Sequence, residues 1–137
     1  MQAETPLLCE ELLAEGFSVL VETNGSRPVQ VLPERVVRVV DVKTPGSGEA
    51  DRFLGANIDL LRLRDECKFV LCDRADYVWA VDFVKNTDLT SRCTVLFAPA
   101  WGQLDPAVLA HWILEEHLPV RLGIQLHKML WGETRGR

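Results

Sequence analysis

Short runs of apolar, mostly β-branched residues alternate with amphipathic stretches along the chain. Each run is bounded by glycine, proline or polar turn residues, which is typical of buried strands. The pattern predicts strands over residues 17–21, 36–42, 67–72, 94–97 and 123–127. Strands that alternate with helices are typical of a parallel α/β sheet or a barrel segment, so we expect one of these architectures.

Two of the intervening helices are indicated by a capping residue followed by proline, at Thr5-Pro6 and Asp105-Pro106. The cap side chain accepts a free N–H, and proline has no N–H to leave unpaired. We expect the first helix to end at Gly16 and the second to run through Glu116. Their inward-facing side chains are expected to be Leu8, Leu12 and Leu13 in the first helix, and Leu109, Trp112 and Ile113 in the second.

The middle of the chain is less clear-cut. Residues 77–84 suit a strand or a helix, and the spacing of Tyr77, Val81 and Val84 favours a helix capped by Asp73. Residues 57–64 predict a short helix with Ile58 and Leu61 inward and Leu60 as a further candidate. Weak alternation over residues 67–72 predicts a strand that is covered on both faces.

Composition narrows the class of protein. The 137 residues carry 15 basic and 20 acidic side chains, a net charge of −5. This length suits a single α/β domain over residues 1–137, and the acidic balance argues against direct nucleic-acid binding. The longest uncharged stretch lies between Arg92 and Asp105, far short of the ~20 residues of a membrane helix. We therefore expect a cytoplasmic protein that does not enter a membrane.

The cysteines do not have the spacing of metal ligands. None of Cys9, Cys67, Cys72 and Cys93 lies in a CxxC or CxxxCxxC motif. In a strand, Cys67 and Cys72 would point to opposite faces. We expect reduced core residues and no metal site.

In a parallel α/β fold, ligands bind at the carboxyl ends of the strands, which here are followed by residues 22–25, 41–49, 98–102 and 127–128. In the second loop Lys43 supplies a cation, and glycines let backbone N–H groups approach an anion, although such a loop can also be an ordinary turn. Glu22 could accept hydrogen bonds from ribose hydroxyls; alternatively, this turn only needs positive φ at Asn24 and Gly25.

The three histidines have different prospects. His111 and His117 lie about 240° apart on a helix, so they cannot share a metal, and we expect both to face solvent. His127 is expected to end the last strand on the ligand side. There a catalytic or substrate-orienting role competes with a structural hydrogen bond.

Three motifs occur in a fixed order: ETNG at residues 22–25, DxKxPGSG at 41–48 and QxHKxxW at 125–131. With them the chain resembles 7-carboxy-7-deazaguanine synthase, a carbon–nitrogen lyase of the radical S-adenosylmethionine (SAM) family. The resemblance implies a partial (β/α) barrel. It also implies that a radical formed from SAM at a 4Fe–4S cluster converts 6-carboxytetrahydropterin to 7-carboxy-7-deazaguanine in queuosine biosynthesis, with magnesium assisting.

The chain departs from this family in one respect. The family's cluster cysteines and GGEP motif precede the region that this chain resembles, and the sequence has neither. The resemblance therefore implies the C-terminal part of the barrel, without cluster ligands and inactive alone. The alternatives are a noncatalytic α/β interaction or nucleotide-binding module, and an unstable pseudogene product.

Residue by residue, the resemblance implies a cofactor wall. Residues expected to bind SAM are Glu22 and Asn24 on the ribose side, Asp41, Val42 and Lys43 at the second strand, and Ala98, Pro99, Ala100 and Trp101 along the adenosyl group. Lys43 suits the carboxylate of SAM, and Trp101 suits stacking. His127 is expected near the pterin substrate.

The first strand suggests self-association. Residues 17–21 are largely apolar and lack an internal lysine or proline, and in the family a preceding strand pairs with this edge. An unprotected edge favours pairing with another copy. We expect a homodimer formed through this strand.

Overall fold

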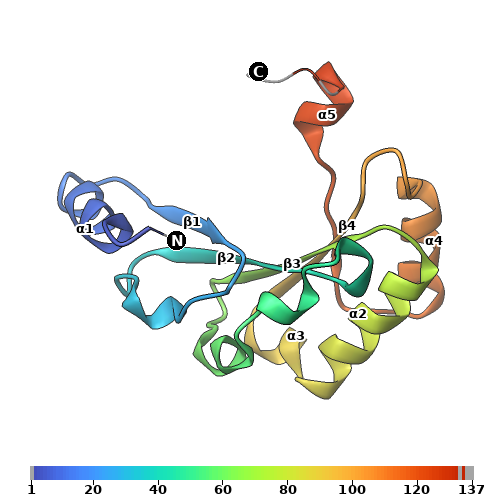
Figure 1. Ribbon diagram of the computed structural model, residues 1–137, viewed down its shortest axis with the longest axis horizontal. Coiled ribbons are helices and arrows are strands. Elements are labelled where there is room, and N and C mark those ends of the chain that lie inside the picture. Colours follow the sequence, from blue (N-terminus) through green and yellow to red (C-terminus); the bar gives the residue numbers. More distant parts are fainter. Residues whose placement is uncertain (1, 133, 135–137) are drawn as a thin grey trace.

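The computed structural model describes residues 2–132 and 134. Five parallel strands form one sheet in the order β1-β2-β3-β4-β5, with helices between them (Figure 1). The strands are β1 Leu20–Thr23, β2 Val37–Val42, β3 Glu66–Leu71, β4 Thr94–Pro99 and β5 Arg121–Leu122. The predicted parallel α/β fold is confirmed, whereas closure as part of a barrel stays a prediction.

The helices lie unevenly about this sheet. They are α1 Thr5–Ala14, α2 Arg74–Asn86, α3 Leu89–Arg92, α4 Pro106–Glu115 and α5 Leu126–Trp131. Helices α2, α3 and α4 lie on one side of the sheet, and α5 stands away on the other side (Figure 1). Helix α1 lies beside β1. Short 3-10 helices occupy residues 29–31, 45–47, 50–52 and 55–60.

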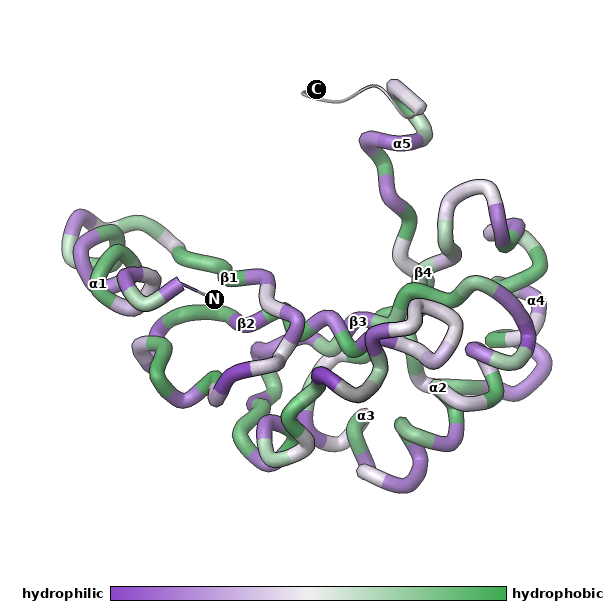
Figure 2. Tube along the Cα trace, viewed as in Figure 1, coloured by the Kyte–Doolittle hydropathy of each residue, from purple (hydrophilic) through white to green (hydrophobic). Residues whose placement is uncertain are grey.

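The main core lies between the sheet and α2–α4. Neighbouring strands place Val42, Phe69 and Phe97 in one row, because Val42 pairs with Phe69 and Phe69 with Phe97. Tyr77 of α2 and Leu109 of α4 pack into the same cluster, and both are fully buried. Figure 2 shows apolar residues along the strands that supply this face.

The opposite face of the sheet is more open. Along β3, buried residues alternate with half-buried ones, and the half-buried positions include Glu66 and Lys68. The prediction that this strand is covered on both faces is wrong, because α2, α3 and α4 all pack on the same side. We call the second side the open face; it contains Glu22, Val39, Asp41, Glu66, Lys68, Leu96 and Ala98.

Local signals placed the helices well where side chains cap them. Asp73 accepts a hydrogen bond from the Asp76 N–H at 2.9 Å and begins α2, and Asp105 accepts one from the Ala107 N–H at 2.8 Å and begins α4. The helical interpretation of residues 77–84 is confirmed. The cap expected from Thr5 is wrong, because Thr5 lies inside α1 and Glu4 precedes it without a side-chain cap.

The buried face of α1 is narrower than expected. Cys9 and Leu13 pack with Leu32 and Val36, whereas Leu8 is 55% exposed. The helix touches only the margin of the sheet, so a single stripe of side chains is covered. The inward position predicted for Leu8 is therefore wrong.

Three boundaries differ from the prediction because pairing with a neighbour decides them. Strand β1 pairs with β2 only from Leu20 onward, so the expected strand over 17–21 is displaced. The helix expected at 57–64 is a 3-10 helix over Gly55–Leu60, with Ile58 and Leu61 buried. The strand expected at 123–127 is wrong: β5 ends at Leu122, and His127 lies in α5.

None of the helices formed by residues 2–132 and 134 is long and apolar enough to cross a membrane.

Candidate functional site

The loops that follow β1, β2 and β4 meet at one edge of the sheet, because parallel strands end on the same side. Two hollows open at this edge. One, of about 390 Å³, lies over the open face and is lined by Glu22, Lys68, Ala98 and His127 among others. The second, of about 640 Å³, lies beside the end of β4 and includes Pro99 and Trp101. The edge therefore gathers predicted site residues from distant parts of the chain.

An ion pair marks the end of β2. Lys43 Nζ donates to Asp41 Oδ2 at 2.6 Å, and the Lys43 side chain is 37% exposed. The other carboxylate oxygen, Asp41 Oδ1, is buried and finds no donor among the residues that the structure describes. A buried acceptor without a donor is costly, so this oxygen suits a donor group of a ligand. The Val42 side chain is buried in the core, which leaves only its main chain for a ligand.

A second ion pair crosses the open face. Lys68 Nζ lies 3.2 Å from Glu22 Oε1, joining β3 to β1 across the intervening strand. Lys68 also shares a row with Asp41, because the two residues are partners in the β2–β3 register. Lys68 is not among the site residues expected from the sequence. A charged residue at an alternating position of a central strand is the signal that could have indicated it.

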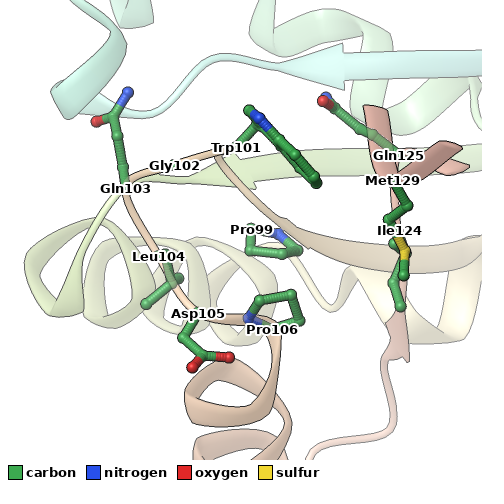
Figure 3. A pocket seen from close by; sticks show the side chains of 10 residues that line it. All are labelled: Pro99, Trp101, Gly102, Gln103, Leu104, Asp105, Pro106, Ile124, Gln125 and Met129. Atoms are coloured by element: carbon green, nitrogen blue, oxygen red, sulfur yellow. The ribbon is translucent and has the colours of Figure 1, made fainter. Parts of the chain in front are cut away.

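The larger hollow has an apolar lining (Figure 3). Figure 3 shows Trp101 on one side with Ile124 and Met129 across from it, and Pro99 and Pro106 below Trp101 in this view. Trp101 is 42% exposed, so its ring is available for contact with a planar group. Gln125 lines both hollows, and its Oε1 is buried with no hydrogen-bond partner in the described part of the chain. The two hollows thus share a polar residue that received no role from sequence alone.

Two predicted residues are occupied by local structure. Asn24 Oδ1 accepts from the Ser26 N–H at 3.2 Å, which closes a turn. Gly25 has a positive φ of 66° and Asn24 does not, so the turn interpretation is confirmed for the glycine alone. The Ala100 N–H donates to the Leu71 carbonyl at 2.8 Å, and Ala100 is buried. Five of the predicted residues lie outside the linings of the two hollows: Asn24, Asp41, Val42, Lys43 and Ala100.

Of the three histidines, one lines a hollow at this edge of the sheet. His111 and His117 are exposed, as expected. His127 is also exposed and lines the smaller hollow, although from the first turn of α5 and not from a strand end. Its role toward a substrate stays a prediction.

A buried carboxylate that sequence analysis missed fastens the loop after β2. Asp76 Oδ2 accepts from Thr44 Oγ1 at 2.9 Å and from the Cys72 N–H at 3.1 Å, while Oδ1 accepts from the Gly46 N–H at 2.8 Å. Burial by itself would raise the pKa of Asp76, but these hydrogen bonds favour the charged form and lower its pKa below the ordinary value. Asp76 is therefore a charged clamp on this loop.

The cysteines do not fit an iron–sulfur cluster. All four are free, and burial raises the pKa of each thiol, to about 11 for Cys93. A cluster ligand must be a thiolate, which these surroundings disfavour. Within residues 2–132 and 134, no group of three or more histidine, cysteine or acidic side chains is placed to hold a metal ion.

Fold and site together define a parallel α/β protein with one helix-covered face and two hollows at the carboxyl edge of its sheet. No protein-family model matches the chain. The chain is similar to proteins named 7-carboxy-7-deazaguanine synthase from several organisms. One from Koribacter versatilis is 44% identical over 141 residues, covering 93% of this chain and 62% of that protein.

Two further relatives with this name agree. The protein from Chlorobaculum tepidum is 39% identical over 86% of this chain and 56% of its own length, and that from Thermoplasma acidophilum is 31% identical over 99% and 65%. The resemblance indicated by the three motifs is confirmed. The chain spans less than two thirds of the length of these relatives.

Proposed function

We propose that the chain forms the SAM-binding and pterin-binding wall of a radical SAM enzyme, a 7-carboxy-7-deazaguanine synthase of queuosine biosynthesis. The relatives' names support the family, and one structural observation supports the role: motif residues that are far apart in sequence lie together at one sheet edge. Glu22 and His127 line one hollow, Trp101 lines the other, and Gln125 joins the two. In the whole enzyme this wall works with a cluster that the cysteines described here do not fit.

The polar groups present suit the amino-acid end of SAM. Lys43 supplies a cation for its carboxylate, and the donor-free Asp41 Oδ1 suits its ammonium group. The hollow beside Trp101 is lined mainly by apolar side chains, and a planar base can lie against such a surface. SAM, when bound and reduced, supplies the radical that starts the rearrangement. The residues of this chain orient it and exclude water.

The smaller hollow suits a polar, planar substrate. Its lining combines the Lys68–Glu22 pair with His127, so it offers both charged groups and an imidazole ring. A carboxylated pterin has an anionic group and several ring donors and acceptors that such side chains can bind. We propose that 6-carboxytetrahydropterin binds here, next to the cofactor. The alternative of a noncatalytic interaction or nucleotide-binding module has no support from these relatives.

Calorimetric titration of the full chain with SAM tests the proposal. We expect weak, saturable binding, and Lys43→Ala should lower the affinity roughly tenfold, as loss of a hydrogen bond between charged groups does. Lys85→Ala is the matched control, because Lys85 is an exposed lysine in the last turn of α2, away from both hollows. No saturable binding, or equal affinities for the Lys43 and Lys85 variants, would contradict the proposed role.

The cysteine environments make a separate prediction. Anaerobic reconstitution of the chain with iron and sulfide should leave it colourless, because buried, protonated thiols on separate elements are poor cluster ligands. Visible absorbance typical of a cluster that disappears when Cys67 or Cys93 is replaced would overturn this interpretation.

A further inference from the structure

The loop that carries Lys43 is held in place from outside the two hollows. Asp76 begins the buried side of α2 and is only 2% exposed. Its two oxygens accept hydrogen bonds from Thr44 and Gly46 of the loop and from Cys72 at the end of β3. One carboxylate therefore ties the residue next to Lys43 to the β3–α2 connection.

The clamp leaves no room for the loop to shift. A Cβ atom on Gly46 would lie 2.6 Å from Asp76 Oδ2 and 2.9 Å from Oδ1, so the backbone approaches as closely as a glycine allows. Thr44 is fully buried. The loop also closes on itself, since Ser47 Oγ donates to the Thr44 carbonyl at 2.6 Å. The backbone that leads out of Lys43 is thus held by hydrogen bonds from two sides.

We propose that Asp76 is a positioning residue for the cofactor site: it sets the backbone of residues 44–46 and, through it, the place of the Lys43 ammonium group. This inference rests on the proposed binding of SAM at Lys43. Asp76 and Lys43 both lie outside the linings of the two hollows, but Lys43 is 37% exposed whereas Asp76 is only 2% exposed, so Asp76 can act on a ligand only through the loop. A group that is already held in place loses little entropy on binding, and this preorganisation is what the clamp contributes.

A double-mutant cycle separates positioning from general stability. In SAM titrations of the full chain we expect Asp76→Asn to weaken binding roughly tenfold, comparable to the loss of one hydrogen bond to a charged group. When Lys43 is already alanine, Asp76→Asn should weaken binding no further, because the group that it positions is gone. Equal losses in both backgrounds would show that Asp76 does not act through Lys43 and would overturn the inference.

Tyr77→Phe serves as the structural control. Tyr77 is the next residue of α2 and is fully buried. Its replacement by phenylalanine removes the hydroxyl that donates a hydrogen bond to the Trp112 carbonyl. In the described structure the hydrogen bonds of Tyr77 do not reach the loop over 44–48, so removal of its hydroxyl should lower stability and leave the affinity for SAM unchanged. An equal loss of affinity in Tyr77→Phe would reduce Asp76 to a stabilising residue of the helix and overturn its positioning role.

Replacements of Thr44 test the same clamp without changing the buried carboxylate. Thr44→Val keeps the shape of the side chain and removes the hydroxyl that donates a hydrogen bond to Asp76. Thr44→Ser retains a hydroxyl at this position. We expect Thr44→Val to bind SAM several-fold more weakly and Thr44→Ser to recover most of the affinity. If the unmodified chain binds SAM and both Thr44→Val and Asp76→Asn bind it with the same affinity, the positioning role of Asp76 is refuted and the proposed function is not. Absence of binding by the unmodified chain refutes the proposed function as well.

Discussion

Adding one methyl group to the loop after β2 should destabilise the whole protein. In Gly46→Ala the new Cβ would meet Asp76 Oδ2 at 2.6 Å and Oδ1 at 2.9 Å, distances that real Cβ atoms essentially never adopt. The backbone of Gly46 does not have a positive φ, so alanine itself is tolerated there and the contact is the whole effect. Asp76 cannot simply rotate away, because three donors hold it.

The size of the effect follows from the bonds that must give way. Relief of the clash separates the loop from Asp76 and weakens the hydrogen bonds from the Gly46 N–H and the Thr44 hydroxyl. Each hydrogen bond to a charged group contributes roughly 1.5–3 kcal/mol, and the loop recovers part of this with water. We therefore expect Gly46→Ala to lower the free energy of unfolding by about 2–4 kcal/mol, a large share of the roughly 5–15 kcal/mol of an ordinary domain.

Urea unfolding followed by tryptophan fluorescence measures this change. Gly55→Ala is the matched control, because Gly55 also lacks a positive φ and its added Cβ would meet nothing within 4 Å. The control should stay within about 0.5 kcal/mol of the unmodified chain. In an Asp76→Ala background the cost of Gly46→Ala should largely disappear, since the clashing oxygens are gone. Equal destabilisation by Gly46→Ala and Gly55→Ala would refute the reasoning.

Three more outcomes are expected. Hydrogen bonds lower the pKa of Asp76 in the folded protein. Its contribution to stability is therefore complete above the pKa of an unfolded aspartate, about 3.9, and is lost as the pH falls through the lower folded value. Acid unfolding should accordingly become less steep in Asp76→Asn. Asn57→Ala should cost about 2–4 kcal/mol in urea unfolding, because the fully buried amide makes hydrogen bonds with the backbone at Val29, Gly25 and Arg27, and a loss under 1 kcal/mol would contradict this. The homodimer expected through the β1 edge should dissociate on Leu20→Lys, since Leu20 is 60% exposed there. Val19 is unsuitable for this test because it packs against the cluster of α1. Light scattering that shows a monomer for the unmodified chain would refute the expected dimer.

Local signals succeeded where neighbouring residues in the sequence decide the structure. The Asp73 and Asp105 caps form within three residues of themselves, and the turn at Gly25 needs only its own φ. The apolar runs of β2, β3 and β4 also lie close to their predicted places, because central strands must be apolar on at least one face. Motif spacing was sufficient to indicate the family, since it needs no coordinates.

Boundaries at the margins of the sheet depended on partners that sequence does not reveal. Residues 17–19 look like strand, but the register with β2 begins at Leu20, and of these three residues only Val19 bonds to β2, through its carbonyl to the Val37 N–H. The residues after Leu122 leave the sheet once the Gly123 N–H has bonded to the Phe97 carbonyl. His127 thereby moved from a predicted strand end to α5. Propensity cannot decide such cases, because a strand exists only where another strand accepts its hydrogen bonds.

For the candidate site, the sequence by itself determined which chemical groups are present: the cation of Lys43, the carboxylates of Glu22 and Asp41, the rings of Trp101 and His127. Only the tertiary structure decided which of them are free to act. It placed Val42 in the core and brought Lys68 beside Glu22 from 46 residues away. It also turned Asp76 inward onto Gly46, 30 residues earlier in the chain. Such contacts arise when parallel strands align their carboxyl ends, and no local pattern of residues encodes that alignment.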